Sequence, residues 1–429
     1  MGAIWVRTVK LATISAMIGN VVEWYDFALY TAATPLVFSR IFFSQQHDPF
    51  LTQIETIAVF ALGFLVRPLG GMIFGAIGDR YGSVTSLRWT LFIIGGATAL
   101  IGTLPTYEQI GLLAPLLLLV LRLVQGIAAG GEWAGSTLVI GQARPPGRPD
   151  QRNIALALSQ SGVALGMVLG TATMWGLRHM PEHVFLSWGW RFGFLATLPF
   201  VAVGLFLRSQ RKLSGKETLP QARQPRLMQF LRQKPLTVIR GVGIRLAENG
   251  GIYLISVFGL VYGRAHHVPD SLLLAGMTCG LIADGLAMPF FGWLSTRFGA
   301  AQVYLAGICA LVLLIVPFFW VVSTGQPVAV IGGFVLIMML GHAPMIAVEP
   351  ILLERLFPPF CQYSGVALAH ELGSTLAGGI SPFLATVLYY RTGSVTGIMV
   401  YVFLLALGSA MALYRSGMHE VVEDHSSQF

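Results

Sequence analysis

The sequence predicts an all-α polytopic membrane protein with twelve transmembrane helices in two six-helix repeats and both termini cytoplasmic. Three observations lead to this prediction. The composition is too apolar for a soluble protein, apolar stretches long enough to cross a bilayer recur along the whole chain, and a short motif of the first half recurs in the second.

The composition identifies a membrane protein and excludes several other classes. Of the 429 residues, 55% are hydrophobic and only 11% are charged, and the mean hydropathy is +0.71. The net charge of +8 would suit nucleic acid. However, the basic residues lie in short loops between apolar spans, so we expect a lipid bilayer and no nucleic acid as partner. The three cysteines lack paired or metal-ligand spacing, so we expect neither a metal nor a cofactor: Cys279, Cys309 and Cys361.

Each predicted helix is an apolar stretch of about 20 residues, the length that crosses a bilayer. The first begins after Arg7 and Lys10 and has no small-residue cleavage site, so we expect an uncleaved span and not a signal peptide. The first six spans lie near residues 13–38, 52–78, 87–105, 112–142, 153–177 and 190–208. The second six lie near residues 238–262, 271–295, 301–322, 327–353, 361–389 and 395–414.

The long polar segment between the two sets of spans predicts their orientation. Residues 209–237 carry seven arginines and lysines, and positively charged loops stay in the cytoplasm. Alternation of the spans then places both termini inside. The predicted domains are an N-terminal bundle at 1–208, a cytoplasmic linker at 209–237, a C-terminal bundle at 238–415 and a cytoplasmic tail at 416–429.

An internal repeat supports the division into halves. The motif "GAIGDRYG" (75–82) follows the second span, and "GWLSTRFG" (292–299) follows the eighth, with Gly-x-x-x-x-Arg-aromatic-Gly in common. Parallel repeats of this kind build transporters whose substrate site lies between the halves, near the middle of the bilayer.

These motifs resemble those of the major facilitator superfamily, and within it the metabolite:proton symporters. That family includes carriers of shikimate, citrate, ketoglutarate and proline/betaine. The resemblance covers nearly the whole chain and implies a monomer in the bacterial inner membrane. It rests on "GNVVEWYDFALY" (19–30), "GFLVRPLGG" (63–71), "RLVQGIAAGGEWAG" (122–135), "SWGWRFGF" (187–194), "RLAENGGIY" (245–253) and "YSGVALAHELGSTLAGGISP" (363–382).

The resemblance also implies a latch of charged residues at the cytoplasmic helix ends. The sequence departs from the family pattern there: Ser83 and Val84 replace the basic pair after the first motif, and Thr296 replaces the aspartate of the second. This departure affects the strength of the latch and not the fold. The expected latch residues are Asp79, Arg80, Arg297, Glu354 and Arg355.

Buried acids in the first span are candidates for proton coupling. Glu23 and Asp26 are three residues apart and therefore share a helix face with Tyr30. Burial and a nearby like charge both favour a protonated acid, so one of the two can bind and release a proton. The alternative is a structural ion pair with Arg67 or Arg122.

The fourth span contributes an arc of polar residues. Arg122, Gln125, Glu132 and Trp133 fall within about 100° of one helix face. Arg122 lies near the midplane, where its guanidinium can bind a substrate carboxylate. Glu132 lies about 15 Å further toward the cytoplasm; we assign it to a network on that side and count it among the proton-coupling candidates.

The seventh span repeats the theme with Arg245 and Asn249, four residues apart, and Tyr253 one turn further on. The alternative is that Arg245 and Glu248 satisfy each other along one helix. Single polar residues such as Asp284, His342 and Glu349 are as compatible with structural contacts as with a site. The predicted substrate-binding residues are Arg122, Gln125, Tyr25, Tyr30, Trp133, Arg245, Asn249, Tyr253 and His370.

Together these features predict a secondary transporter that takes up a small organic acid or zwitterionic metabolite with a proton. The alternatives are proton-driven efflux and, from another class, a membrane enzyme or a non-transporting sensor on the same fold. We expect no enzyme, because the sequence has no phosphate-binding loop and no nucleophile–base or metal set. The sequence does not decide the identity of the substrate.

Overall fold

The computed structural model describes residues 2–44, 58–59, 61–142, 149–210 and 226–414. Within this part of the chain the regular structure is entirely helical, which confirms the all-α prediction. Three predicted features fall wholly or partly outside the described residues: the start of the second span, most of the linker and the C-terminal tail.

The helices of the first half are long rods interrupted by short irregular turns. Five-residue π-helical turns, written η, follow α1 and α9. The elements are α1 (Gly2–Ala33), η1 (Thr34–Phe38), α2 (Ser39–Ile41), α4 (Arg67–Tyr81), α5 (Ser83–Ile101), α6 (Tyr107–Ile110), α7 (Leu113–Gln142), α8 (Pro149–Leu177), α9 (Glu182–Val184), η2 (Phe185–Gly189), α10 (Trp190–Leu195) and α11 (Thr197–Ser209).

The second half follows the same plan after a short amphipathic helix, α12 (Arg226–Gln233). Its η elements are π-helical turns except η5, which is a 3₁₀ turn. The elements are α13 (Pro235–Tyr253), η3 (Leu254–Phe258), α14 (Gly259–Ala265), α15 (Asp270–Phe298), α16 (Ala300–Ser323), α17 (Pro327–Ile337), η4 (Met338–His342), α18 (Ala343–Leu356), η5 (Pro359–Cys361), α19 (Gln362–Gly373), η6 (Ser374–Gly378), α20 (Gly379–Thr392) and α21 (Thr396–Tyr414).

Eleven helical stretches among the described residues are long and apolar enough to cross a membrane. They match the second to twelfth predicted spans to within a few residues at most ends. The first predicted span lies in α1, which carries Asn20, Glu23 and Asp26 near its middle and is not among the eleven. The count of twelve and the orientation in the membrane therefore stay predictions.

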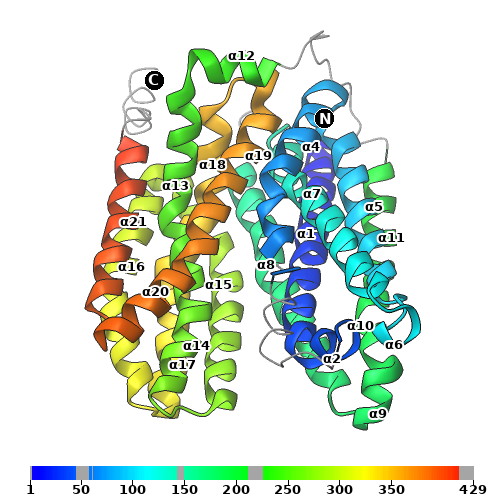
Figure 1. The fold of residues 1–429 in the computed structure, drawn as a ribbon. Coiled ribbons are helices and arrows are strands. Elements are labelled where there is room, and N and C mark those ends of the chain that lie inside the picture. The colour runs from blue at the N-terminus through cyan, green and yellow to red at the C-terminus, as the bar shows by residue number, and fades with distance from the viewer. Residues whose placement is uncertain (1, 45–57, 60, 143–148, 211–225, 415–429) are drawn as a thin grey trace, which may run out of the picture.

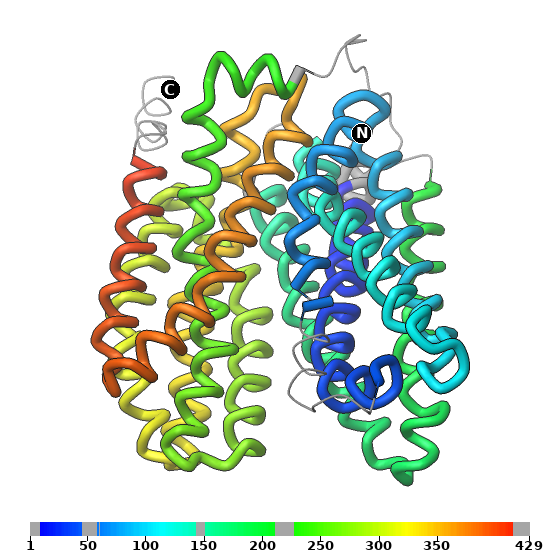
Figure 2. The backbone as a smooth tube through the Cα atoms, viewed as in Figure 1, coloured from blue at the N-terminus to red at the C-terminus, as the bar shows by residue number. Residues whose placement is uncertain are grey.

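The helices form two bundles that lie side by side, one from each half of the chain (Figure 1). The tube view shows the same division, with the blue-to-green helices in one bundle and the green-to-red helices in the other (Figure 2). Across the seam, α8 packs against α15 and α4 against α19. We call the end of the molecule that carries α12 the linker end and the opposite end, where α14 finishes, the far end.

The repeated motif has the same geometry in both halves. Gly82 joins α4 to α5 with φ 94° and ψ 149°, and Gly299 joins α15 to α16 with φ 90° and ψ 148°. Positive φ values of this size favour glycine, so both copies need a glycine at this position. The repeat seen in the sequence is therefore a repeat of structure.

Close approach of α4 and α7 within the first bundle also depends on glycine. A Cβ atom at Gly126 would lie 2.0 Å from the carbonyl oxygen of Gly63, and one at Gly130 would lie 2.0 Å from that of Arg67. Gly126 and Gly130 are four residues apart on α7, and this spacing of small residues lets two backbones touch, as it does in other membrane bundles.

Candidate functional site

A cavity of about 310 Å³ lies between the two bundles. Its walls come from α1, α7 and α8 of the first half and from α13, η3, α14, α15, η4 and α18 of the second. It extends along α13 and α14 from Arg245 to Arg264, about 28 Å at 1.5 Å per residue. Because the side chain of Arg264 is exposed at the far end, the cavity reaches that end of the molecule.

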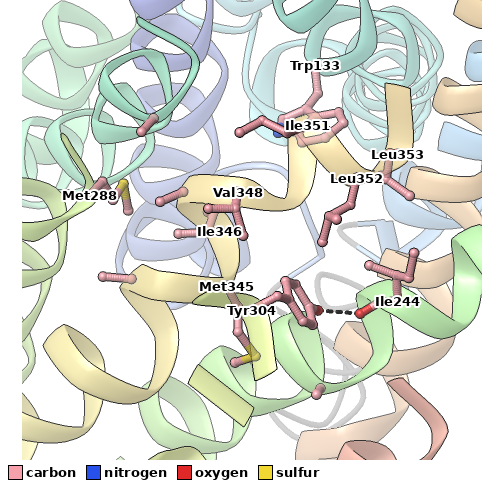
Figure 3. Close-up of a cluster of buried hydrophobic side chains, with 14 of the residues drawn as sticks. Trp133, Ile244, Met288, Tyr304, Met345, Ile346, Val348, Ile351, Leu352 and Leu353 are labelled. Atoms are coloured by element: carbon pink, nitrogen blue, oxygen red, sulfur yellow. Dashed lines mark hydrogen bonds between the residues drawn. The ribbon is translucent and has the colours of Figure 1, made fainter. Parts of the chain in front are cut away.

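The inner limit of the cavity is a stack of two rings, one from each half. The indole of Trp133 on α7 lies 3.8 Å from the imidazole of His370 on α19, with 18° between the ring planes. Trp133 Nε1 donates to Gln160 Oε1 over 2.9 Å, which fixes the indole. Trp133 also belongs to a buried apolar cluster with Ile351 and Leu352 of α18 (Figure 3). The halves are therefore in tight contact on the linker side of the cavity.

Arg245 lies at the inner end of the cavity and is held by three side chains. Its Nε donates to Ser374 Oγ over 2.8 Å. Its Nη1 donates both to Glu248 Oε2 over 3.0 Å and to Glu349 Oε1 over 2.7 Å. Its Nη2 has no hydrogen bond to any described residue, although Arg245 lines the cavity. One guanidinium nitrogen is thus available to a ligand.

A buried histidine links two further acids in the same wall. His342 Nδ1 lies 2.9 Å from Asp284 Oδ1, and its Nε2 lies 2.9 Å from Glu248 Oε1. All three residues line the cavity. Together with Arg245 and Glu349 they form one continuous polar cluster, which we call the C-terminal cluster.

Asn249 and Tyr253 line the cavity one and two turns beyond Arg245. Asn249 is buried, and its Oδ1 has no hydrogen-bond partner among the described residues. Gly378 makes room for both side chains, because a Cβ there would lie 2.4 Å from Asn249 Oδ1 and 2.8 Å from the Tyr253 ring. This oxygen is itself buried against Gly378, so it can accept from a hydroxyl or ammonium group of a ligand only once the Asn249 side chain turns toward the cavity.

The polar residues of the first half form separate ion pairs. Glu23 pairs with Arg67 over 3.0 Å. Asp26 pairs with Arg122 over 3.3 Å and accepts hydrogen bonds of 2.8 Å from both Thr98 and Gln125. A small void of about 10 Å³ separates these two pairs.

Glu132 and the two tyrosines lie elsewhere in the first bundle. Glu132 is fully buried and is bound by Arg208 of α11 and Thr90 of α5. The Tyr25 hydroxyl donates to the carbonyl of Gly193 over 2.8 Å. Tyr30 packs in an aromatic group with Phe38, with the Arg122 guanidinium 4.1 Å from its ring centre.

The structure thus brings together some of the predicted residues and separates others. Trp133, Arg245, Asn249 and Tyr253 line the cavity, and His370 stacks beneath it. The other predicted substrate or proton residues are absent from its lining: Glu23, Tyr25, Asp26, Tyr30, Arg122, Gln125 and Glu132. Their predicted roles stay predictions.

Some residues that line the cavity or hold its lining side chains were not candidates from the sequence. Gln160 and Ser374 carried no signal, because single polar residues on apolar helices are common. Asp284 and His342 were noted only as isolated polar residues, and their pairing joins helices 58 residues apart in sequence. Among the described residues, no group of His, Cys, Asp or Glu is placed to hold a metal ion.

Polar contacts join the two halves at the linker end. Asp79 at the end of α4 accepts hydrogen bonds from the backbone N–H groups of Tyr363, over 2.9 Å, and Ser364, over 3.2 Å. These groups belong to the first turn of α19, where a negative charge is favourable. Glu354 at the end of α18 pairs with Arg152 of α8.

The remaining predicted latch residues make local contacts. Arg80 lies over the ring of Tyr81 at 5.1 Å, and Arg297 lies over the ring of Trp293 at 4.4 Å. Arg355 is exposed at the end of α18. The second copy of the motif lacks a counterpart of Asp79, because Thr296 donates only to the carbonyl of Trp293 within its own helix.

Removing the charge of Asp79 should loosen the linker end. Asp79→Asn is expected to weaken the contact between the halves by about 1–2 kcal/mol, because a charge-assisted hydrogen bond is lost. The fraction of molecules in which the linker end is open should then rise roughly fivefold to thirtyfold. The reporter is Cys361, which is fully buried beside this contact. In a Cys279→Ser, Cys309→Ser background, a thiol reagent should label it faster by that factor. Asp270→Asn, at the exposed far end, is the control; equal rates in the two variants would contradict the assignment.

Comparison with known proteins agrees with this architecture. Residues 16–382 match the family described as "Major Facilitator Superfamily". The chain is 33% identical to the shikimate transporter of Escherichia coli K12, over 96% of this chain and 95% of the relative. It is 28% identical to the proline/betaine transporter of the same strain, over 88% and 77%. The fold is similar to that of the proton:xylose symporter XylE, with a TM-score of 0.72, 14% identity and 95% of both chains covered.

Proposed function

The chain belongs to the major facilitator superfamily, and we propose that it takes up a small organic acid or zwitterionic metabolite together with a proton. As a member of this family it is a multi-pass integral membrane transporter and not an enzyme. We place it in the bacterial inner membrane, with the linker end in the cytoplasm.

The central cavity is the observation that supports this proposal most directly. It lies between the halves, is walled mainly by apolar side chains and has a few convergent polar groups at its inner end, as small-molecule sites do. A guanidinium, an amide oxygen and an indole come together there from Arg245, Asn249 and Trp133. A compact molecule with a carboxylate and a hydroxyl or ammonium group would bind the guanidinium and the amide and pack against the indole.

The difference between the two ends supports alternating access. The cavity reaches the far end, while Asp79, Glu354 and the apolar cluster around Trp133 hold the linker end together. We propose that residues 1–208 and 238–415 move as two bodies joined by 209–237, and that breaking these contacts opens the cavity to the cytoplasm.

The substrate class is proposed from chemistry and from the relatives together. One relative is a shikimate transporter and another a proline/betaine transporter, and the substrates in both names carry a carboxylate. Arg245 Nη2 offers that group a charged donor, and the aromatic side chains of Trp24, Trp133 and Tyr253 offer a wall for a ring or a quaternary amine.

Uptake by purified protein tests the proposal. The protein is placed in liposomes with an acidic exterior and an alkaline interior, and labelled shikimate, citrate, ketoglutarate, proline and glycine betaine are supplied in turn. Gradient-dependent accumulation of at least one, abolished by a proton ionophore, is expected. Gradient-driven expulsion would indicate efflux, and no response to any member of the panel would favour a non-transporting role.

Asp26 is the strongest proton-coupling candidate of the first half. A coupling role for Asp26 predicts that Asp26→Asn loses gradient-driven accumulation and keeps downhill exchange of labelled for unlabelled substrate, because asparagine cannot carry a proton yet keeps the bonds to Thr98 and Gln125 within reach. Glu182→Gln, an exposed acid of α9, is the control. Normal accumulation by the Asp26 variant would remove this residue from the coupling role.

A further inference from the structure

The C-terminal cluster contains more acids than bases. Glu248 and Glu349 both accept from the same nitrogen of Arg245, so the two carboxylates lie beside each other. Asp284 is attached through His342. The cluster has only two basic groups, the guanidinium of Arg245 and the imidazole of His342. One negative charge is therefore unbalanced even when His342 is protonated.

Neighbouring helices do not supply the missing positive charge. Tyr304 of α16 lies close to Glu349, and its hydroxyl donates to the carbonyl of Ile244. His370 and Glu371 of α19 face the cluster as well, but they pair with each other over 2.8 Å. In the first half, Arg67 is already paired with Glu23.

Two adjacent carboxylates in a buried site do not both stay ionised, and one proton shared between them is the usual outcome. The hydrogen bonds favour Glu349 Oε2 as the oxygen that holds the proton. Both oxygens of Glu248 are occupied, one by Arg245 and the other by His342. By contrast, Glu349 Oε2 has no hydrogen-bond partner among the described residues and is fully buried.

The same pair controls the charge that Arg245 presents to the cavity. With both glutamates ionised, the guanidinium is overcompensated, and a substrate carboxylate at Nη2 would be a third negative charge around one positive group. With one glutamate neutral, the charge of Arg245 is balanced by the other glutamate alone. A substrate carboxylate is then not repelled and can accept from Arg245 Nη2.

We propose that Glu248 and Glu349 share the transported proton and that substrate binding at Arg245 requires it. This inference rests on the proposed uptake with a proton and adds the location of the proton and the order of events. The proton reaches the pair from the cavity, the substrate carboxylate then binds Arg245 Nη2, and loss of the proton on the cytoplasmic side restores the repulsion that expels the substrate.

Isosteric neutral variants test the proposal. Glu349→Gln and Glu248→Gln each imitate the protonated pair, and Glu182→Gln is the matched control at an exposed position. In wild-type protein the Kd for substrate should rise tenfold per pH unit above the titration of the pair, because binding takes up one proton. In both variants the Kd should stay constant at the low-pH value, exchange should persist, and gradient-driven accumulation should be lost.

A second measurement does not depend on the folding of the variants. When substrate is added to wild-type protein in weakly buffered solution, at a pH where its Kd rises tenfold per pH unit, about one proton per bound molecule should be taken up from the medium. Glu182→Gln should take up the same amount, and either glutamine variant of the pair should take up none. No uptake by wild-type protein would overturn the proposal.

The two proposals fail in different ways. If wild-type protein accumulates no substrate under a proton gradient, the proposed function fails. If wild-type protein accumulates substrate and Glu349→Gln and Glu248→Gln do so equally well, uptake with a proton stands and the location of the proton at this pair is wrong.

Discussion

Replacing Arg245 by alanine is expected to abolish substrate binding, raising the Kd at least about 100-fold, or roughly 3 kcal/mol. The substrate loses its charged donor, and Glu248 and Glu349 lose the nitrogen that both of them use. The buried glutamates then lack their shared charged donor, so the unfolding temperature of the variant should fall as well.

Two companion variants separate these effects. Arg245→Lys keeps a positive charge near the glutamates but not the planar set of donors, so it should recover the unfolding temperature more fully than the affinity. Arg391→Ala removes an exposed arginine from the end of α20 and should change neither quantity. Calorimetric titration and thermal unfolding in detergent give the two readouts. An unchanged Kd in folded Arg245→Ala would remove Arg245 from the site.

Replacing Gly130 by alanine is expected to prevent correct packing of the first bundle. The new Cβ would lie 2.0 Å from the carbonyl oxygen of Arg67 and 2.8 Å from the nitrogen of Gly71. Backbone atoms cannot rotate away as side chains can, so α4 and α7 must separate, and we expect a loss of stability of about 3 kcal/mol or more.

The matched control is Gly96→Ala in α5, where a Cβ would meet nothing within 4 Å. That change should be neutral or slightly stabilising, because alanine is the better helix former by about 1 kcal/mol. The yield of monodisperse protein on size exclusion and the unfolding temperature measure both variants. Equal behaviour of the two would contradict the close contact between α4 and α7.

The fold was predictable because its main features depend on local patterns in the sequence. Apolar length predicts a membrane helix without knowledge of its neighbours, and the repeated motif at Gly82 and Gly299 predicts the division into halves. What local patterns do not reveal is irregularity within a helix. The π-helical turn at Leu254–Phe258, for example, is made of ordinary apolar residues and serine, and nothing in their order distinguishes them from a regular helix.

The site was harder to predict because helix periodicity places residues on a face but does not say what the face meets. Arg122 and Trp133 share a face of α7, yet Trp133 reaches the cavity and Arg122 pairs with Asp26 within its own bundle. The alternative considered from the sequence, ion pairs with Arg67 and Arg122, matches the contacts in the structure for both acids of α1.

Contacts between residues distant in sequence could not be predicted either. The counter-charge of Glu132 is Arg208, which ends α11 at the edge of the polar linker and looks there like an ordinary positive-inside residue. His342 and Asp284 each lacked a visible partner, because the contact between α15 and η4 exists only once the second bundle is assembled.

The ring stack between Trp133 and His370 has a consequence for how the protein can be observed. One ring belongs to each half, and they are nearly parallel at 3.8 Å. Opening of the linker end must draw the indole away from the imidazole, which changes the quenching of its ultraviolet emission. The chain therefore carries an intrinsic fluorophore at its seam, and once the other eight tryptophans are replaced by phenylalanine its light output can follow opening without any added dye.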